Sequence, residues 1–243
     1  MKLTCFGRYG PYPKGGSATS CYMISHDGKN VLIELGCGGL SKFLAQYTVA
    51  DIDAIVLSHL HADHMGDMLT LRYALKVAQI NGSITKGVPV YCPDKPKTEA
   101  GMLAADPLMD TVPLCDGYRC KIFNMDVSFA HMPHPYESFA MRFSADDKTF
   151  VYSGDVMDND RLAVFAKDAD LFLMEAALQQ KDVHSKSAHL SAVRAGEIGM
   201  QANAKRMLIT HLFPEYDERD VISEVRQHYK EARMIEENKT YEV

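Results

Sequence analysis

Ser58-His59-Leu60-His61-Ala62-Asp63-His64 contains three imidazoles and a carboxylate within six residues, and it directly follows a short apolar run with the composition of a buried strand. Side chains alternate along an extended strand end, so His59 and His61 point to the same side and can hold one metal ion. After a turn, Asp63 and His64 can face a second ion. Imidazole and carboxylate groups suit zinc and similar divalent ions, and four of them this close together are more than one tetrahedral ion readily takes from so short a loop. The spacing therefore predicts two metal ions, whereas the alternative is a loop of solvated polar residues.

Two further candidates also stand just past apolar, strand-like runs. Asp155 follows the run at 150–154, and His211 follows the run at 207–210. Ligand sites in α/β proteins gather at such strand ends because rigid strands hold the loops there. We therefore expect both side chains to lie near the 58–64 stretch.

The 59–64 stretch resembles the signature of the metallo-β-lactamase superfamily, and more of the chain resembles the ribonuclease Z-like branch of that superfamily. Five segments carry the resemblance, in the same order, over about residues 1–216: His134-Pro135-Tyr136-Glu137-Ser138-Phe139-Ala140-Met141-Arg142, Tyr152-Ser153-Gly154-Asp155, Leu173-Met174-Glu175-Ala176, His189-Leu190-Ser191-Ala192 and Leu208-Ile209-Thr210-His211-Leu212-Phe213-Pro214. Met174 stands where the branch usually has a histidine. His131 lies near the first segment, but its offset from the strand does not match, so His134 is the expected ligand.

The resemblance implies an α/β fold, namely a four-layer αββα sandwich of the metallo-β-lactamase type. It also implies the metal ligands: His59, His61 and His134 on one ion, Asp63, His64 and His211 on the other, and Asp155 bridging the two. Two Zn²⁺ ions are the expected cofactors, although such a His/Asp set also accepts Mn²⁺ or iron.

The expected reaction is hydrolysis. Two divalent ions about 3.5–4 Å apart hold a bridging hydroxide at neutral pH, and this hydroxide is expected to attack a phosphorus bound to both ions. Asp63 is expected to orient the nucleophile while it binds a metal. By the resemblance, His189 stabilises charge on the phosphate or protonates the leaving oxygen, and Glu175 holds His189 in orientation. A strand-end carboxylate paired with a lysine is the alternative for Glu175.

The substrate is expected to be small. Ribonuclease Z enzymes that process tRNA carry a long insertion that grips the tRNA, in many of them between the third histidine motif and the bridging aspartate. Here His134 and Asp155 are only 21 positions apart, and the formal net charge of −6 argues against a large nucleic-acid surface. We therefore expect a phosphodiesterase that acts on small, cyclic-nucleotide-like phosphodiesters. The alternatives are tRNA 3′ processing, hydrolysis of a carboxyl ester, lactone or thioester, and a non-catalytic metal-binding sensor.

Length and composition fit one domain that spans residues 1–243, with 47% hydrophobic residues. No stretch approaches the roughly 20 apolar residues of a membrane span, and the first residues lack the apolar core of a signal peptide. We therefore expect a cytoplasmic protein with no membrane partner, and a homodimer would fit the branch.

The six cysteines form no C-x-x-C pair, which argues against a structural zinc site. Cys115 and Cys120 could meet across a hairpin, although a cytosolic disulfide is disfavoured.

Strand and helix patterns alternate along the chain. They predict strands near residues 2–6, 20–26, 30–35, 52–57, 88–92, 119–123, 127–131, 138–143, 149–153, 171–175 and 206–210. They predict helices near residues 40–47, 66–80, 161–166, 191–202 and 218–236, with Ser191 as an N-cap.

Five polar residues near these motifs each have two interpretations. Asp67 could hold a ligand histidine in its tautomer, or it could be a first-turn helix carboxylate. Arg8 and Lys14 could lie near a phosphate, although a Gly/Pro turn between strands is favoured there. Lys181 and Lys186 could contact an anionic substrate, although a solvated surface is favoured.

Overall fold

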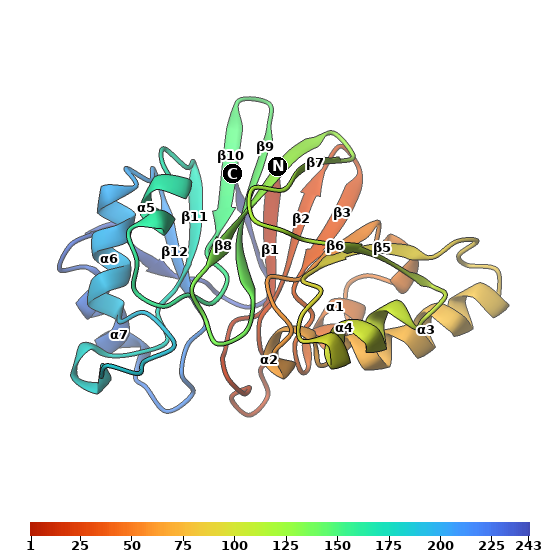
Figure 1. The fold of residues 1–243 in the computed structure, drawn as a ribbon, viewed down its shortest axis with the longest axis horizontal. Coiled ribbons are helices and arrows are strands. Elements are labelled where there is room, and N and C mark those ends of the chain that lie inside the picture. Colours follow the sequence, from red (N-terminus) through yellow and green to blue (C-terminus); the bar gives the residue numbers. More distant parts are fainter.

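The computed structural model describes residues 1–243 and contains two seven-stranded sheets that pack face to face, with helices on the outer side of each (Figure 1). The first sheet has the order β14-β1-β2-β3-β4-β5-β6, and the second has the order β13-β12-β11-β10-β9-β8-β7. The expected four-layer αββα sandwich is therefore confirmed.

The strands of the first sheet are β1 (Lys2–Gly7), β2 (Cys21–His26), β3 (Lys29–Ile33), β4 (Ala54–Val56), β5 (Val88–Cys92), β6 (Met109–Pro113) and β14 (Lys239–Glu242). Those of the second are β7 (Arg119–Ile122), β8 (Met125–Met132), β9 (Ser138–Ala145), β10 (Lys148–Tyr152), β11 (Leu171–Glu175), β12 (Met207–Thr210) and β13 (Arg233–Met234).

The helices divide between the two outer layers. The first half of the chain contributes α1 (Gly39–Leu44), α2 (Ala62–Met65), α3 (Met68–Ile80), α4 (Lys97–Ala104) and the 3₁₀ turn Val49–Asp51. The second half contributes α5 (Arg161–Phe165), the 3₁₀ turn Gln180–Asp182, α6 (Ala192–Gln201) and α7 (Glu218–Val225). Figure 1 shows α1, α3 and α4 on one side of the sandwich and α5, α6 and α7 on the other.

Three buried clusters hold these layers together. Between the sheets, Tyr22 and Val56 of the first sheet belong to the same cluster as Phe150 of the second. A second cluster joins the first sheet to α3 through residues such as Leu71, and a third joins the second sheet to α6 through residues such as Ile198. The central strands are buried on both faces, which explains why their sequences are continuously apolar rather than alternating.

The parallel parts of the two sheets determine where polar side chains can meet. Strands β3, β4, β5 and β6 run parallel to one another, and so do β10, β11, β12 and β13. The carboxyl ends of parallel strands share one edge of a sheet, and in open α/β sheets ligands bind outside that edge. The segments after β4, β10, β11 and β12 therefore form one surface, at the bottom of Figure 1.

The C-terminal region differs most from the sequence prediction. The helix expected over residues 218–236 ends at Val225, because the chain turns back and adds β13 to β12 and then β14 to β1. Helix α4 and strands β6, β13 and β14 were not predicted, and helical structure begins already at Ala62 rather than at residue 66.

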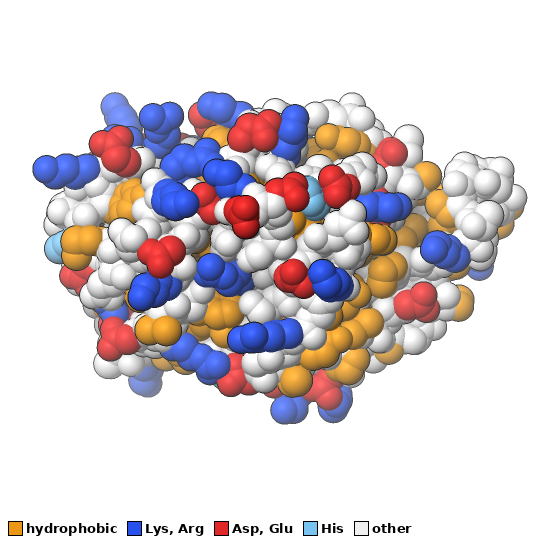
Figure 2. Space-filling view, turned by 90° about the horizontal axis from the view of Figure 1, so that it is seen from above, with side chains coloured by type: hydrophobic (Ala, Val, Ile, Leu, Met, Phe, Trp, Pro, Cys, Tyr) orange, Lys and Arg blue, Asp and Glu red, His pale blue; other side chains and the backbone are white.

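The end of the sandwich opposite the parallel strand ends carries interspersed basic and acidic side chains (Figure 2). All six cysteines are free, so the Cys115–Cys120 alternative is wrong. No helix combines the length and the apolar character that crossing a bilayer would need.

Candidate metal centre

The 58–64 stretch turns sharply out of β4 and into α2. Its first residue, Ser58, is buried, and its backbone N–H donates to both carboxylate oxygens of Glu34, at 3.1 and 3.2 Å. His61 then takes the N-cap position of α2 with an extended backbone, and the backbone N–H of His64 donates to its carbonyl. This turn is what places the histidines and Asp63 around one point.

The first cluster of candidate ligands consists of His59, His61, His134 and Asp155. The distance from His59 Nε2 to His61 Nδ1 is 3.0 Å, and that from His134 Nε2 to the same atom is 3.3 Å. His59 Nε2 lies 3.5 Å from Asp155 Oδ2. His134 donates from Nδ1 to the carbonyl of Ala188 at 3.1 Å, so its Nε2 lone pair faces the cluster.

The second cluster consists of Asp63, His64, Asp155 and His211. His211 Nε2 lies 3.1 Å from Asp63 Oδ2 and 3.3 Å from Asp155 Oδ2. His64 Nε2 lies 3.3 Å from Asp155 Oδ2 and 3.5 Å from Asp63 Oδ2. His211 follows β12 with a φ of 55°, a left-handed conformation that is unusual for a residue with a side chain.

Asp155 belongs to both clusters, and the same oxygen, Oδ2, faces each of them. The structure thus brings together all seven side chains that the sequence singled out for metal binding, from loops of both sheets. Within each cluster the candidate donor atoms lie within 4.8 Å of one another. Imidazole nitrogens and carboxylate oxygens in groups of four match the donor sets of divalent transition metals.

The three histidines of the first cluster are suited to offer lone pairs. Burial lowers the pKa of His59 and His61, and it lowers the pKa of His134 to about 4. A neutral imidazole is the form that ligates a metal. All three rings are therefore in that form at pH 7.

The second cluster favours positive charge. Burial alone would lower the pKa of His64, but the carboxylates of Asp155, Asp63 and Glu34 raise it well above its usual value. Burial alone would raise the pKa of Asp63 and Asp155, yet the facing imidazoles lower both. The carboxylates of Asp63, Asp155 and Glu34 around one buried ring make a pocket in which a cation is stabilised.

Several buried polar atoms of the site have no hydrogen-bond partner: both ring nitrogens of His64, Oδ1 of Asp155 and Nδ1 of His211. A buried polar atom without a partner costs about 1–3 kcal/mol. Native structures rarely leave several such atoms together, and a metal ion is one of the ligands that satisfies them. The donor set and its unpartnered atoms therefore fit divalent cations.

His189 and Glu175 lie beside the two clusters. His189 Nδ1 is 3.2 Å from Glu175 Oε1 and 3.8 Å from Asp155 Oδ2. Burial would lower the pKa of His189, but the Glu175 and Asp155 carboxylates raise it to about 9. Glu175 also accepts from the backbone N–H of Val156 at 2.8 Å, so it is fixed at the end of β11 and is not paired with a lysine.

Two residues beside the site were not singled out from the sequence. Glu34 is fully buried after β3, and its Oε1 lies 3.5 Å from His64 Nδ1. Tyr136 places its ring 3.9 Å from that of His61. The signal for Glu34 was an acidic residue at the end of an apolar strand, which is the same kind of position that identified Asp155.

The structure decides the residues with two interpretations. Asp67 contacts no histidine and stands at the N-cap position of α3 rather than in its first turn, so neither interpretation holds; its carboxylate accepts from the backbone N–H of Leu40 in α1, at 2.9 Å. Arg8 is committed to Glu218, with Nη1 3.1 Å from Oε2, so it is not free for a phosphate. The remaining three side chains are exposed and form no ion pair: Lys14, Lys181 and Lys186.

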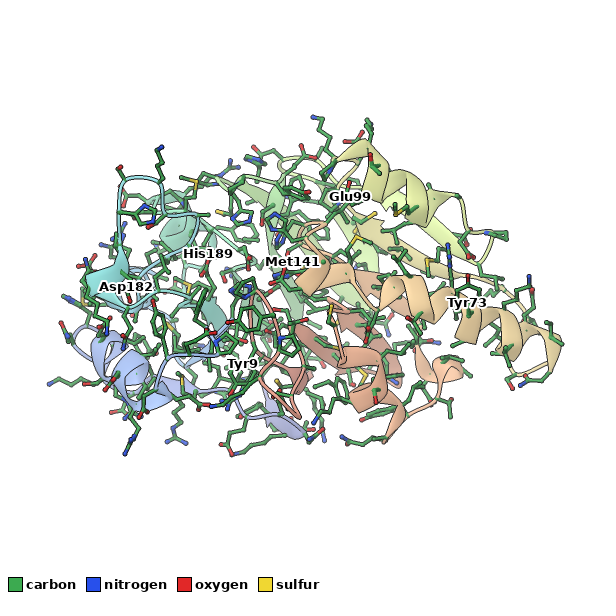
Figure 3. All side chains as sticks on the ribbon, turned by 90° about the horizontal axis from the view of Figure 1, so that it is seen from below. Tyr9, Tyr73, Glu99, Met141, Asp182 and His189 are labelled. Atoms are coloured by element: carbon green, nitrogen blue, oxygen red, sulfur yellow. The ribbon has the colours of Figure 1, made fainter.

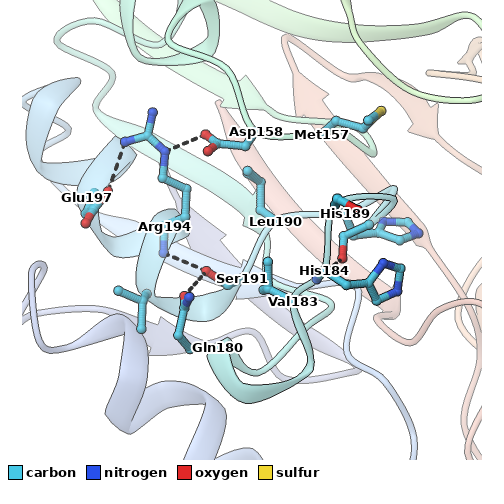
Figure 4. A pocket seen from close by; sticks show the side chains of 13 residues that line it. Met157, Asp158, Gln180, Val183, His184, His189, Leu190, Ser191, Arg194 and Glu197 are labelled. Atoms are coloured by element: carbon cyan, nitrogen blue, oxygen red, sulfur yellow. Dashed lines mark hydrogen bonds and ion pairs between the residues drawn. The ribbon is translucent and has the colours of Figure 1, made fainter.

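A cleft of about 470 Å³ opens beside His189 and continues toward α6 (Figure 4). His189 is therefore shared between this cleft and the two clusters of candidate ligands. Figure 3 shows the same end of the molecule, with His189 and Tyr9 near its centre and Asp182 farther out on the same side as α6 and α7.

Known proteins resemble this chain in sequence and in fold. Residues 30–212 match the family described as "Beta-lactamase superfamily domain". A protein of Bacillus subtilis (strain 168), described as "Probable metallo-hydrolase YhfI", is 31% identical over 221 residues, which cover 87% of each chain. Its crystal structure superposes with a TM-score of 0.95 at 25% identity and covers 100% of this chain and 99% of that one.

Two further solved structures share the fold. Human tRNase Z, short form, has a TM-score of 0.79 at 18% identity and covers 100% of this chain and 99% of its own. A diphosphatase from the PhnP family has a TM-score of 0.77 at 18% identity, with coverage of 100% and 97%. At this level of identity the likeness concerns the fold alone.

Proposed function

The chain belongs to the beta-lactamase superfamily, and it has the metallo-β-lactamase fold of the ribonuclease Z-like branch. We therefore propose that it is a metal-dependent hydrolase of small phosphodiesters. The observation that carries the proposal is the pair of four-residue donor clusters that share Asp155 Oδ2. A cyclic-nucleotide-like phosphodiester is the substrate type that we favour.

We assign the donors as the geometry groups them. His59, His61 and His134 would hold one divalent ion, Asp63, His64 and His211 the other, and Asp155 both. Zn²⁺ is the metal we favour. Two such ions, when bound, supply Lewis acidity toward a phosphate and lower the pKa of a coordinated water toward about 7.

The remaining roles belong to side chains of this chain. Asp63 is ionised in its histidine surroundings, so it can accept a hydrogen bond from the attacking water and orient it. Glu175 holds the Nδ1–H of His189, which leaves Nε2 of His189 to donate a proton to the leaving oxygen. The raised pKa of His189 keeps that proton in place at pH 7.

One observation favours a small substrate, and another favours chemistry at phosphorus. Strands β9 and β10 and their turn fill the interval between His134 and Asp155, so this interval has no arm that could grip a tRNA. Two of the fold relatives are named for action on tRNA and on a diphosphate, which favours chemistry at phosphorus over chemistry at a carbonyl.

The test is the variant His189→Ala, assayed with bis(p-nitrophenyl) phosphate after zinc loading. We expect kcat to fall about 10²–10⁴-fold while the metal content stays that of the parent, because His189 moves a proton without binding metal. His131→Ala is the matched control, since His131 lies on β8 outside both clusters.

Parent-like turnover by His189→Ala would remove His189 from the mechanism. A parallel panel of a lactone, a thioester and a carboxyl ester tests the reaction class. Faster hydrolysis of any of these than of the phosphodiester would refute the phosphodiesterase proposal while leaving the metal centre intact.

A further inference from the structure

The cleft beside His189 lies between the loop after β10, the 180–187 loop and the start of α6. Its walls combine apolar side chains, such as Leu190 and Val193, with hydrogen-bonding ones, such as Gln180 and Ser187. A volume of about 470 Å³ is within the range of small-molecule sites, about 300–1,000 Å³. The cleft is thus large enough for the part of a substrate that extends beyond a phosphate at the metal centre.

The one arginine of the cleft is not available to an anion. Each guanidinium nitrogen of Arg194 is paired with a carboxylate: Nε with Asp158 at 2.6 Å, Nη2 with Asp160 at 2.7 Å and Nη1 with Glu197 at 3.0 Å (Figure 4 shows the pairs with Asp158 and Glu197). Two of these carboxylates, Asp158 and Glu197, line the cleft together with Arg194, so the charged side chains of this wall are negative overall.

His189 also lines the cleft, but its ring is paired with the carboxylate of Glu175 and does not offset these carboxylates. Lys181 and Lys186 lie in the adjoining loop, but neither lines the cleft. The N-terminus of α6, which would attract an anion, is capped from within, because Ser191 Oγ accepts from the backbone N–H of Arg194 at 3.1 Å. A second phosphate in the cleft would therefore be repelled by the carboxylates and would find no free cationic group to bind it.

We propose that this cleft binds the non-reacting part of the substrate, and that this part is an uncharged, hydrogen-bonding group of nucleoside size rather than one that carries a further phosphate. The inference rests on the proposed function, because it assumes that the reacting phosphate lies at the metal centre. It narrows the substrate class to phosphodiesters with a single phosphate and excludes oligonucleotides and polyphosphates.

A matched pair of chromogenic esters tests the proposal on the zinc-loaded protein. One is the p-nitrophenyl ester of thymidine 5′-phosphate, and the other is the same ester with an additional 3′-phosphate. In both, water adds to the 5′ phosphorus and p-nitrophenolate leaves, so only the charge on the nucleoside differs. We expect kcat/KM to be about tenfold lower for the 3′-phosphate ester, because of repulsion by nearby carboxylates.

The double variant Asp158→Asn/Glu197→Gln removes two of the three carboxylates. We expect it to bring the two esters within about twofold of each other, mainly through a lower KM for the 3′-phosphate ester. The control is Asp126→Asn/Glu242→Gln, which makes the same change of charge away from the cleft: Asp126 and Asp158 are both 71% exposed, and so is Glu242. The control should keep the tenfold difference.

The outcomes separate the two proposals. Equal or faster cleavage of the 3′-phosphate ester by the parent, or an unchanged ratio in Asp158→Asn/Glu197→Gln, would overturn the inference about the cleft alone. If the parent hydrolyses neither ester and leaves bis(p-nitrophenyl) phosphate intact as well, the proposed function itself fails. A zinc content equal to that of the parent in both variants, measured by elemental analysis, shows that the metal centre is undamaged.

Discussion

The ring of His64 lies among three carboxylates. This ring is fully buried, with Asp63 and Asp155 on one side and Glu34 on the other. A carboxylate behind a ligand histidine fixes the orientation of the ring and makes its other nitrogen a better donor. Glu34 stands in that relation to His64, and it also holds the 58–64 loop through the backbone of Ser58.

We therefore expect Glu34→Gln to weaken zinc binding about 10–100-fold, since the amide keeps the shape of the side chain but loses its charge. Competition with a chromophoric chelator measures this affinity. Glu236→Gln, which changes an exposed glutamate paired with Lys239, is the control and should bind zinc like the parent. Unchanged affinity in Glu34→Gln would show that Glu34 serves only the loop backbone.

At this scale, the sequence predicted the residues whose type and spacing are unusual by themselves. Three histidines within six positions needed no knowledge of distant contacts. Glu34 was missed because a single acidic residue after a strand is common, and its contact with His64 depends on how β3 and β4 pair. Asp67 was ambiguous for the same reason, since its partner Leu40 is 27 positions away.

The loop after β1 packs closely against His211, one of the candidate ligands. Tyr9 bridges to Leu212, and the backbone N–H of Gly10 donates to the carbonyl of Leu212 at 3.1 Å. A Cβ on Gly10 would lie only 2.0 Å from Nε2 of His211. Only glycine leaves room there for the His211 ring in its present position.

Gly10→Ala should therefore displace His211 and disturb the second donor cluster selectively. We expect the zinc content to fall from two ions per chain toward one. We also expect overpacking to lower the free energy of unfolding by about 1–3 kcal/mol. Elemental analysis after dialysis measures the content, and thermal unfolding of the metal-free protein measures the stability.

Gly15→Ala is the control in the same loop, because a Cβ on Gly15 would meet no atom within 4 Å. It should retain both ions. Retention of both ions by Gly10→Ala would contradict the view that the β1 loop shapes the second cluster.

Elements with strong local patterns were predicted well. Strands β5 and β11 have the expected bounds, and Ser191 caps α6 as expected. The short strands β13 and β14 were missed because pairing with β12 and β1, not local sequence, makes them strands. The predicted helix over 218–236 failed for the same reason: its polar residues fit a helix, but sheet pairing takes over beyond Val225.

At the scale of the whole molecule, the two sheets contribute complementary halves of the donor set. The first sheet supplies the 58–64 loop, and the second supplies His134, Asp155 and His211. The sequence predicted that these segments meet because each one stands at a strand end, and the order of segments matched one known architecture. The charge of the cleft could not be predicted from the sequence, because it depends on ion pairs between Arg194 and acidic residues more than 30 positions away.

Three expectations about the whole chain stay predictions: a single domain over residues 1–243, a cytoplasmic location and a homodimer. The metal centre is more decisive for function, because every proposed role depends on where the cations bind. One experiment can locate these cations.

That experiment is anomalous diffraction from crystals of the zinc-loaded protein, with data collected on both sides of the zinc absorption edge. We predict two anomalous peaks, one enclosed by His59, His61 and His134 and the other by Asp63, His64 and His211, with Asp155 between them. No peak among these side chains, or zinc bound only elsewhere on the chain, would contradict the account.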